Sequence, residues 1–172
     1  MKARNFLPVL IGICICSCST IRDATNNPDD VALHSTNLTA LNGSFKRFST
    51  VGESDLFWDF FVTGYNKNQN DRVKLTVIDD RHIRVALISD GNLLREKILK
   101  GKIEGGYFVF NRRTIVYPLL LANLYKDSKI RVGILKNGNL TTDSKSLRYG
   151  TIIIFPFFEK EENFNREFET AL

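Results

Sequence analysis

Three cysteines lie close together near the start of the chain, and no other cysteine follows them. Cys14, Cys16 and Cys18 occupy alternate positions within five residues. Cysteines at such short spacing can ligate a metal, form disulfides or supply a thiolate nucleophile. The neighbouring residues distinguish between these roles.

The segment around the cysteines has the layout of a secretory signal. Lys2 and Arg4 give a positively charged start, and a short apolar run extends from Phe6 to Ile15. A run of this length is about half of what a membrane-spanning helix needs. Small Ser17 comes directly before Cys18, as a signal cleavage site requires. The pattern therefore predicts an exported protein rather than one with a transmembrane anchor.

Ile15-Cys16-Ser17-Cys18 resembles the lipobox of bacterial lipoproteins. In that motif a small residue precedes an invariant cysteine, and the cysteine sulfur takes a diacylglyceryl group. The resemblance implies that residues 1–17 are removed and that Cys18 becomes the acylated N-terminus. Cys14 and Cys16 do not fit the acceptor position, because bulky isoleucines precede them. Two or more acyl chains anchor a protein stably, so membrane attachment is expected.

The same resemblance implies a place in the bacterial cell envelope. In the sorting rule of many Gram-negative envelopes, Asp after the acylated cysteine retains a lipoprotein at the inner membrane. This chain has Ser19 there, which predicts delivery to the outer membrane. Since acylation consumes the last cysteine of the mature chain, we expect neither a disulfide nor a cysteine-based metal site.

Residues 18–40 are polar and show no sustained apolar period. We expect them to form a flexible tether between the anchor and one folded domain, residues 41–172. Loss of Lys2 and Arg4 with the signal lowers the formal charge from +5 to +3, because 22 basic residues then face 19 acidic ones. That excess is too small to predict binding of nucleic acid.

From Leu41 onward, short segments alternate apolar and polar residues between turn signals, which is typical of antiparallel strands. Residues 73–78 and 83–88 predict one hairpin, and Asn137-Gly138 lies at the tip of another. Further strands are predicted at residues 93–103, 107–110, 129–135, 140–143 and 151–158. The sequence thus predicts an all-β fold, an antiparallel up-and-down meander.

Two helices are expected beside these strands. The dipeptide Ser54-Asp55 offers an N-cap for a short helix that runs to Phe61. Near the C-terminus, Phe164, Phe168 and Leu172 recur at every fourth position, with glutamates off this stripe. The spacing predicts an amphipathic helix that packs back on the domain.

The order of these elements resembles that of lipocalin-like barrels in small bacterial envelope lipoproteins, over residues 41–158. The resemblance rests on a first strand at residues 41–45, then a short helix and then the meander. Lipocalins carry Gly-x-Trp in their first strand, where this chain has Gly43-Ser44-Phe45. The resemblance implies that the meander closes into a small barrel. The thirteen phenylalanines either fill its core or line a cavity.

Few residues outside the signal have the pattern of a catalytic site. His34 falls in the expected tether and His82 in an expected turn. Neither a Gly-x-Ser-x-Gly elbow nor a phosphate-binding glycine loop occurs. Asp79-Asp80 belongs to the same turn, where neighbouring carboxylates do not face one substrate. We therefore expect no enzymatic activity, no cofactor and no metal site.

A group of basic residues comes from two strands that are expected to pair. Its members are Arg95, Lys97, Lys100, Lys102, Arg112 and Arg113. The interpretation that we favour is a solvated outer face with lysines that block a sheet edge. The alternative is a surface that contacts anionic head groups or an acidic partner.

Two functions follow from these patterns. The preferred one is a membrane-tethered, non-catalytic binding or carrier module whose barrel holds a small apolar ligand or lipid. Its motivation is the meander together with the many Phe and Ile residues. The alternative is a structural or interaction module that docks on another envelope protein, through the region of Arg112 and Arg113 or through the C-terminal helix.

Overall fold

A computed structural model describes residues 27–50, 54–61, 70–118, 122–152 and 155–171. The predicted signal peptide and Cys18 lie outside these residues. The described part is almost entirely β-structure, and each pair of neighbouring strands is antiparallel. The all-β, antiparallel part of the sequence prediction is therefore confirmed. No helix in these ranges has the length and apolar character needed to cross a bilayer.

Four strands form the shorter of two sheets, in the order β2-β3-β4-β5. They are β2 (Gly43–Lys46), β3 (Arg72–Val77), β4 (His82–Ser89) and β5 (Asn92–Lys100). Alternate residues such as Val73 and Leu75 are buried, as the sequence pattern predicts. Asp90 and Gly91 connect β4 to β5 with φ angles of 49° and 81°, the conformation that a two-residue hairpin turn requires.

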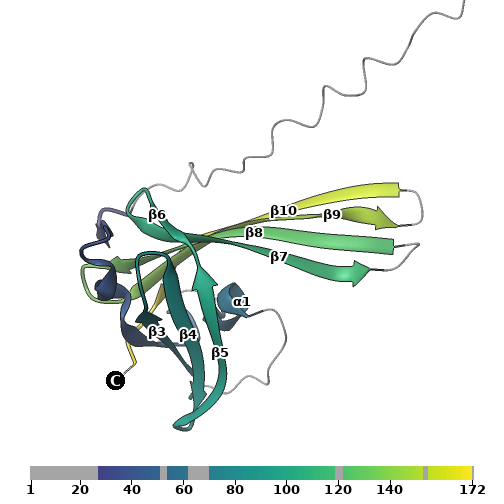
Figure 1. Ribbon diagram of the computed structural model, residues 1–172. Helices are drawn as coiled ribbons and strands as arrows, with labels where there is room; N and C mark the ends of the chain where they lie inside the picture. Colours follow the sequence, from purple (N-terminus) through teal and green to yellow (C-terminus); the bar gives the residue numbers. More distant parts are fainter. Residues whose placement is uncertain (1–26, 51–53, 62–69, 119–121, 153–154, 172) are drawn as a thin grey trace, which may run out of the picture.

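The longer sheet has the strand order β10-β9-β8-β7-β6, with β1 paired to β8. Its strands are β1 (Asp30–Val31), β6 (Lys102–Glu104), β7 (Tyr107–Pro118), β8 (Ala122–Leu135), β9 (Leu140–Ile152) and β10 (Phe155–Phe168). Figure 1 shows β7 to β10 extending well past the shorter sheet. One half of the longer sheet therefore covers the core, and the other half projects from it.

The two sheets are joined at two places. The strand expected over residues 93–103 is divided at Gly101, where the chain passes from β5 to β6. A Cβ at Gly101 would lie 2.5 Å from the Phe108 ring, so only glycine fits this crossing. On the other side, the Ala171 N–H donates to the Ser44 carbonyl oxygen at 2.7 Å, which links the end of the chain to β2.

The core lies between the two sheets and is rich in phenylalanine. Its buried rings belong to Phe45, Phe57, Phe60, Phe61, Phe108, Phe110 and Phe168. One helical turn, α1 (Leu56–Phe60), presents part of this set, and the Asp55 carboxylate caps it by accepting the Phe57 N–H at 2.9 Å. These phenylalanines thus fill the core, whereas Phe158, placed in a predicted apolar strand, is 75% exposed.

Residues 27–40 belong to the folded domain, so the predicted tether and the predicted domain start at residue 41 are wrong for this part. Leu33 and Leu38 are buried in the core, and the 3-10 helix η1 (Leu38–Leu41) follows them. The Leu33 N–H also donates to the Gly106 carbonyl oxygen at 2.8 Å. A few well-placed apolar side chains suffice to dock a segment whose average composition is polar.

The predicted C-terminal helix is also wrong, because residues 155–168 form β10 against β9. Spacing of four residues places side chains on one face of a strand as well as on one face of a helix. Phe164 and Phe168 therefore could not distinguish the two structures. Phe168 is fully buried, and a bulge with Asn165 at a φ of 54° lies between the two phenylalanines. Leu172 lies outside the described residues.

Candidate functional site

A polar pocket lies between α1 and the core-facing side of the longer sheet. Its volume is about 480 Å³, which suits a small ligand. Residues directly opposite each other in antiparallel strands share a face. Ser128 of β8 is opposite Arg112 of β7 and Ser146 of β9, while the next row toward the core contains Ile130 and Phe110. The face therefore changes from apolar to polar where the sheet begins to project.

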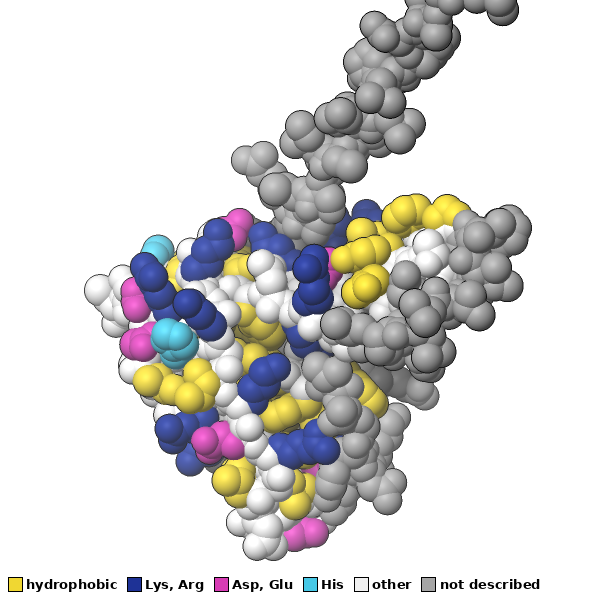
Figure 2. Space-filling view, turned by 45° about the vertical axis from the view of Figure 1, so that its right-hand side comes forward, with side chains coloured by type: hydrophobic (Ala, Val, Ile, Leu, Met, Phe, Trp, Pro, Cys, Tyr) yellow, Lys and Arg dark blue, Asp and Glu magenta, His cyan; other side chains and the backbone are white. Residues whose placement is uncertain are grey.

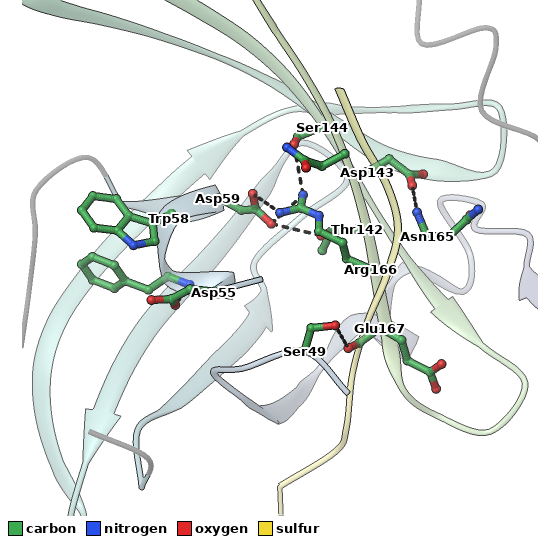
Figure 3. A network of polar contacts seen from close by, with 12 residues as sticks. Ser49, Asp55, Trp58, Asp59, Thr142, Asp143, Ser144, Asn165, Arg166 and Glu167 are labelled. Carbon is green, nitrogen blue, oxygen red and sulfur yellow. Dashed lines mark hydrogen bonds and ion pairs between the residues drawn. The ribbon is translucent and has the colours of Figure 1, made fainter. Parts of the chain in front are cut away.

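Asp59 of α1 and Arg166 of β10 form the central contact of the pocket wall (Figure 3). The two Nη atoms of Arg166 bind the two carboxylate oxygens of Asp59 at 3.0 Å each. Thr142 donates its hydroxyl to the same carboxylate at 3.0 Å, and Arg166 also donates to Ser144 at 3.1 Å. Burial raises the pKa of the Asp59 carboxyl, although Arg166 and Thr142 act in the opposite direction. This paired contact fixes α1 on the sheet.

Arg112 of β7 holds the backbone at the same, C-terminal end of α1. Its Nη1 atom donates to the carbonyl oxygens of Asp59 at 3.1 Å and Phe61 at 3.3 Å, and also to that of Trp58. Carbonyl groups at a helix C-terminus carry partial negative charge and attract a cation. Burial lowers the pKa of the Arg112 guanidinium. Arg112 therefore caps the C-terminal end of the helix from β7.

Three buried polar atoms of this pocket have no hydrogen-bond partner: Nε of Arg112, Oγ of Ser128 and Nε of Arg166. Five buried side-chain atoms are in this state among the residues that the structure describes, so most of them gather at one cavity. An unmet buried donor or acceptor costs about 1–3 kcal/mol, and folded proteins rarely leave such groups unpaired. Arg112, Ser128 and Arg166, which carry three of these five atoms, all line this pocket, and we therefore consider it as a ligand site.

Other residues that line the pocket carry further charges. Lys126 binds Glu161 at 3.1 Å, and Arg148 lies 3.7 Å from the same carboxylate. Burial acts to raise the pKa of Glu161, but the hydrogen bond and charge of Lys126, together with Asn163 and Arg148, outweigh it and hold the pKa below its ordinary value. Trp58, which is 45% exposed, is the aromatic residue of the lining.

Ser128→Ala tests whether the Ser128 hydroxyl, which has no hydrogen-bond partner, destabilises the folded protein. We expect the free energy of unfolding to rise by about 1 kcal/mol, because the change removes a buried group that has no partner. Ser144→Ala is the matched control, since it removes an acceptor of Arg166 and should lower stability by about 1 kcal/mol. Thermal or urea denaturation measures both, and equal destabilisation by the two changes would contradict the interpretation.

The basic residues predicted to form one surface are divided between the two sheets, and the two arginines on β7 lie on opposite faces of the longer sheet. Arg112 points into the pocket, whereas its neighbour Arg113 lies on the opposite face and binds Asp127 at 2.8 Å. That hydrogen bond and the charge of Asp127 raise the pKa of Arg113. Arg112 and Arg113 are therefore neighbours in the sequence but lie on opposite faces of the sheet.

The lysines of the same predicted group are divided as well. Lys97 is opposite Val85 and Lys100 is opposite His82, so the two lie on opposite faces of β5. Lys102 follows on β6 and binds Glu104 at 3.2 Å. Of the predicted basic group, only Arg112 contributes to the pocket.

Sequence patterns did not identify most of the pocket. Asp59 and Arg166 are 107 residues apart in the chain, and no local motif connects them. His82, the histidine considered for catalysis, is the first residue of β4, and the Asp79 carboxylate in the preceding turn accepts the His82 and Arg81 N–H groups at 2.8 Å each. Within the described ranges, no group of three His, Cys, Asp or Glu residues is placed to hold a metal ion.

Searches with this chain against protein-family models, curated proteins and solved structures find no match, so the pocket's own side chains are the basis for a function.

Proposed function

We propose that this chain is an envelope lipoprotein, anchored to the outer membrane through acylated Cys18, whose β-domain binds a small anionic ligand without catalysis. The anchor is supported by the lipobox resemblance of residues 15–18. The ligand is supported by one observation, the three unmet polar atoms of Arg112, Ser128 and Arg166 at the same cavity.

The chemistry of these atoms selects the ligand class. Two are guanidinium N–H donors and the third belongs to a hydroxyl, so the complementary group is an oxygen acceptor, best a carboxylate or phosphate. Four basic and three acidic side chains line the pocket, which leaves an excess of positive charge. The exposed ring of Trp58 offers a flat apolar surface for a sugar ring. A small acidic sugar combines these features.

An apolar ligand inside a closed barrel has less support from the described residues. The space between the sheets is occupied by the phenylalanine core, and the pocket beside it is polar. The lipocalin-like barrel itself stays a proposal. Its support is that the meander passes from one sheet to the other at Gly101 and returns through the hydrogen bond between Ser44 and Ala171.

Trp58, the single tryptophan of the chain, provides a direct test of ligand binding. Glucuronate and inorganic phosphate should change its fluorescence in a saturable way, because both place oxygen acceptors beside a ring that lines the pocket. Neutral glucose should bind at least about tenfold more weakly, since it lacks the charge that strengthens hydrogen bonds to guanidinium groups. No saturable response to either anion would contradict the proposal.

Adjacent arginines supply a matched pair of variants for the same titration. Arg112→Lys keeps the charge that holds α1 but removes the unmet Nε–H, so affinity should fall about tenfold. Arg113→Lys makes the identical change one residue away on the opposite face and should leave affinity unchanged. Equal effects of the two variants would show that the anion binds elsewhere.

A further inference from the structure

We propose that the face of the longer sheet opposite the pocket, here called the outer face, lies against the lipid bilayer. The inference rests on the proposed anchor at Cys18 and adds an orientation to it. The outer face is identified by strand register through residues such as Arg113, Tyr125, Tyr149 and Phe158. Three independent features of the molecule support a lipid surface as its occupant.

The first feature is the short chain between the anchor and the folded domain. Eight residues separate Cys18 from Asn27, where the described structure begins. Even fully extended they reach only about 30 Å, less than the roughly 45 Å length of β8. The first described residues lie beside the outer face, because Tyr107 on that face donates its hydroxyl to Asp30. The anchor therefore keeps this face near the membrane.

The second feature is an aromatic patch on the projecting part of the outer face. Phe158 of β10 is opposite Tyr149 of β9, which is opposite Tyr125 of β8. The two tyrosine rings stack with centroids 5.6 Å apart, and Phe158 is 75% exposed. Figure 2 shows hydrophobic side chains gathered along this end of the molecule. Aromatic side chains of this kind are enriched where proteins meet the membrane interface.

The third feature is the charge of the outer face. Its ion pairs join six basic side chains to four acidic ones. They are Arg113–Asp127, Lys102–Glu104, Lys129–Glu104, Arg131–Asp143, Lys145–Glu162 and Lys160–Glu162. Two carboxylates are each shared by two lysines, so the paired set retains positive charge. Such a surface is attracted to anionic lipid head groups.

This orientation has a consequence for the pocket. Arg112 and Ser128 point to the side of the sheet that Arg113 and Asp127 do not occupy. With the outer face on the bilayer, the pocket opens away from the lipid and toward the aqueous phase. A soluble anion then reaches it without crossing the head groups.

The test uses the mature acylated protein in vesicles of phosphatidylethanolamine and phosphatidylglycerol whose acyl chains carry bromine, a short-range quencher of tryptophan. In a Trp58→Phe background, Phe158→Trp places the only tryptophan on the aromatic patch. We expect it to lose most of its fluorescence and to shift to shorter wavelength on reconstitution. Both substituted side chains are at least 45% exposed, so folding should be retained.

Two controls have tryptophan on other surfaces. The unchanged protein carries Trp58 at the pocket, and Leu93→Trp in the same Trp58→Phe background uses a 59% exposed position on β5. Neither should be quenched. An unquenched tryptophan at position 158, or equal quenching at all three positions, would overturn the orientation. Mass spectrometry distinguishes a wrong orientation from a wrong anchor. Absence of acyl chains on Cys18 would overturn the proposed anchoring and the orientation together.

Discussion

Replacing Arg47 with alanine is expected to lower the free energy of unfolding by about 3–5 kcal/mol. The Arg47 side chain is completely buried and binds two buried carboxylates. Its Nε and Nη2 atoms donate to the two oxygens of Asp55 at 2.9 and 2.8 Å, and Nη1 donates to Asp71. Alanine would leave both carboxylates without their cation in the interior, which is the costly way to break a buried ion pair.

The same contact supports the pocket. Burial disfavours the charge of Arg47, but its hydrogen bonds to Asp55 and Asp71 outweigh this and raise its pKa. Asp55 is also the N-cap of α1, the helix that carries Trp58 and Asp59. Loss of Arg47 should therefore reduce the response of Trp58 to glucuronate as well as stability.

Arg84→Ala is the control for this prediction, measured by urea denaturation under the same conditions. Arg84 is about half exposed and lies 3.6 Å from Glu96, also exposed. Exposed ion pairs contribute little, so this change should alter stability by at most about 0.5 kcal/mol. A loss below about 1 kcal/mol for Arg47→Ala would contradict the role given to the buried cluster.

Cys18→Ala is expected to abolish anchoring completely. Without the Cys18 sulfur no diacylglyceryl group can be attached, and the chain should accumulate as an unprocessed precursor. Labelled fatty acid and membrane fractionation measure the two effects. Cys16→Ala is the matched control and should be lipidated normally, because isoleucine before Cys16 does not fit an acylation site. Lipidation of the Cys18→Ala protein would show that the anchor is assigned to the wrong residue.

Local patterns in the sequence were sufficient to predict most strands and turns. The alternation around Val73 and Leu75 and the turn signal at Asn137-Gly138 act over a few residues, and each forms the strand or turn expected of it. Patterns that fit two structures were not sufficient. The spacing of Phe164 and Phe168 suits a strand as well as a helix, and burial against distant β-strands decided the outcome.

The pocket could not be predicted because its contacts are formed by the fold. Ser128, Arg112 and Arg166 come from three strands. No motif in the segment around any of them marks it as part of a binding site. The sequence did single out Arg112, but together with Arg113, as if adjacent arginines formed one surface. On a strand, adjacent side chains point to opposite faces, so one arginine lines the pocket and the other lies on the outer face.

Arginine side-chain NMR on the folded protein tests the central claim most directly, because the Nε–H of each arginine gives its own signal. During titration with glucuronate, the signals of Arg112 and Arg166 should shift in a saturable way with one common affinity, since these Nε–H groups have no partner in the free pocket. The signal of Arg113, already bound to Asp127, should not move. A shift confined to Arg113, or no shift at Arg112 and Arg166, would contradict the assignment of the pocket as an anion site.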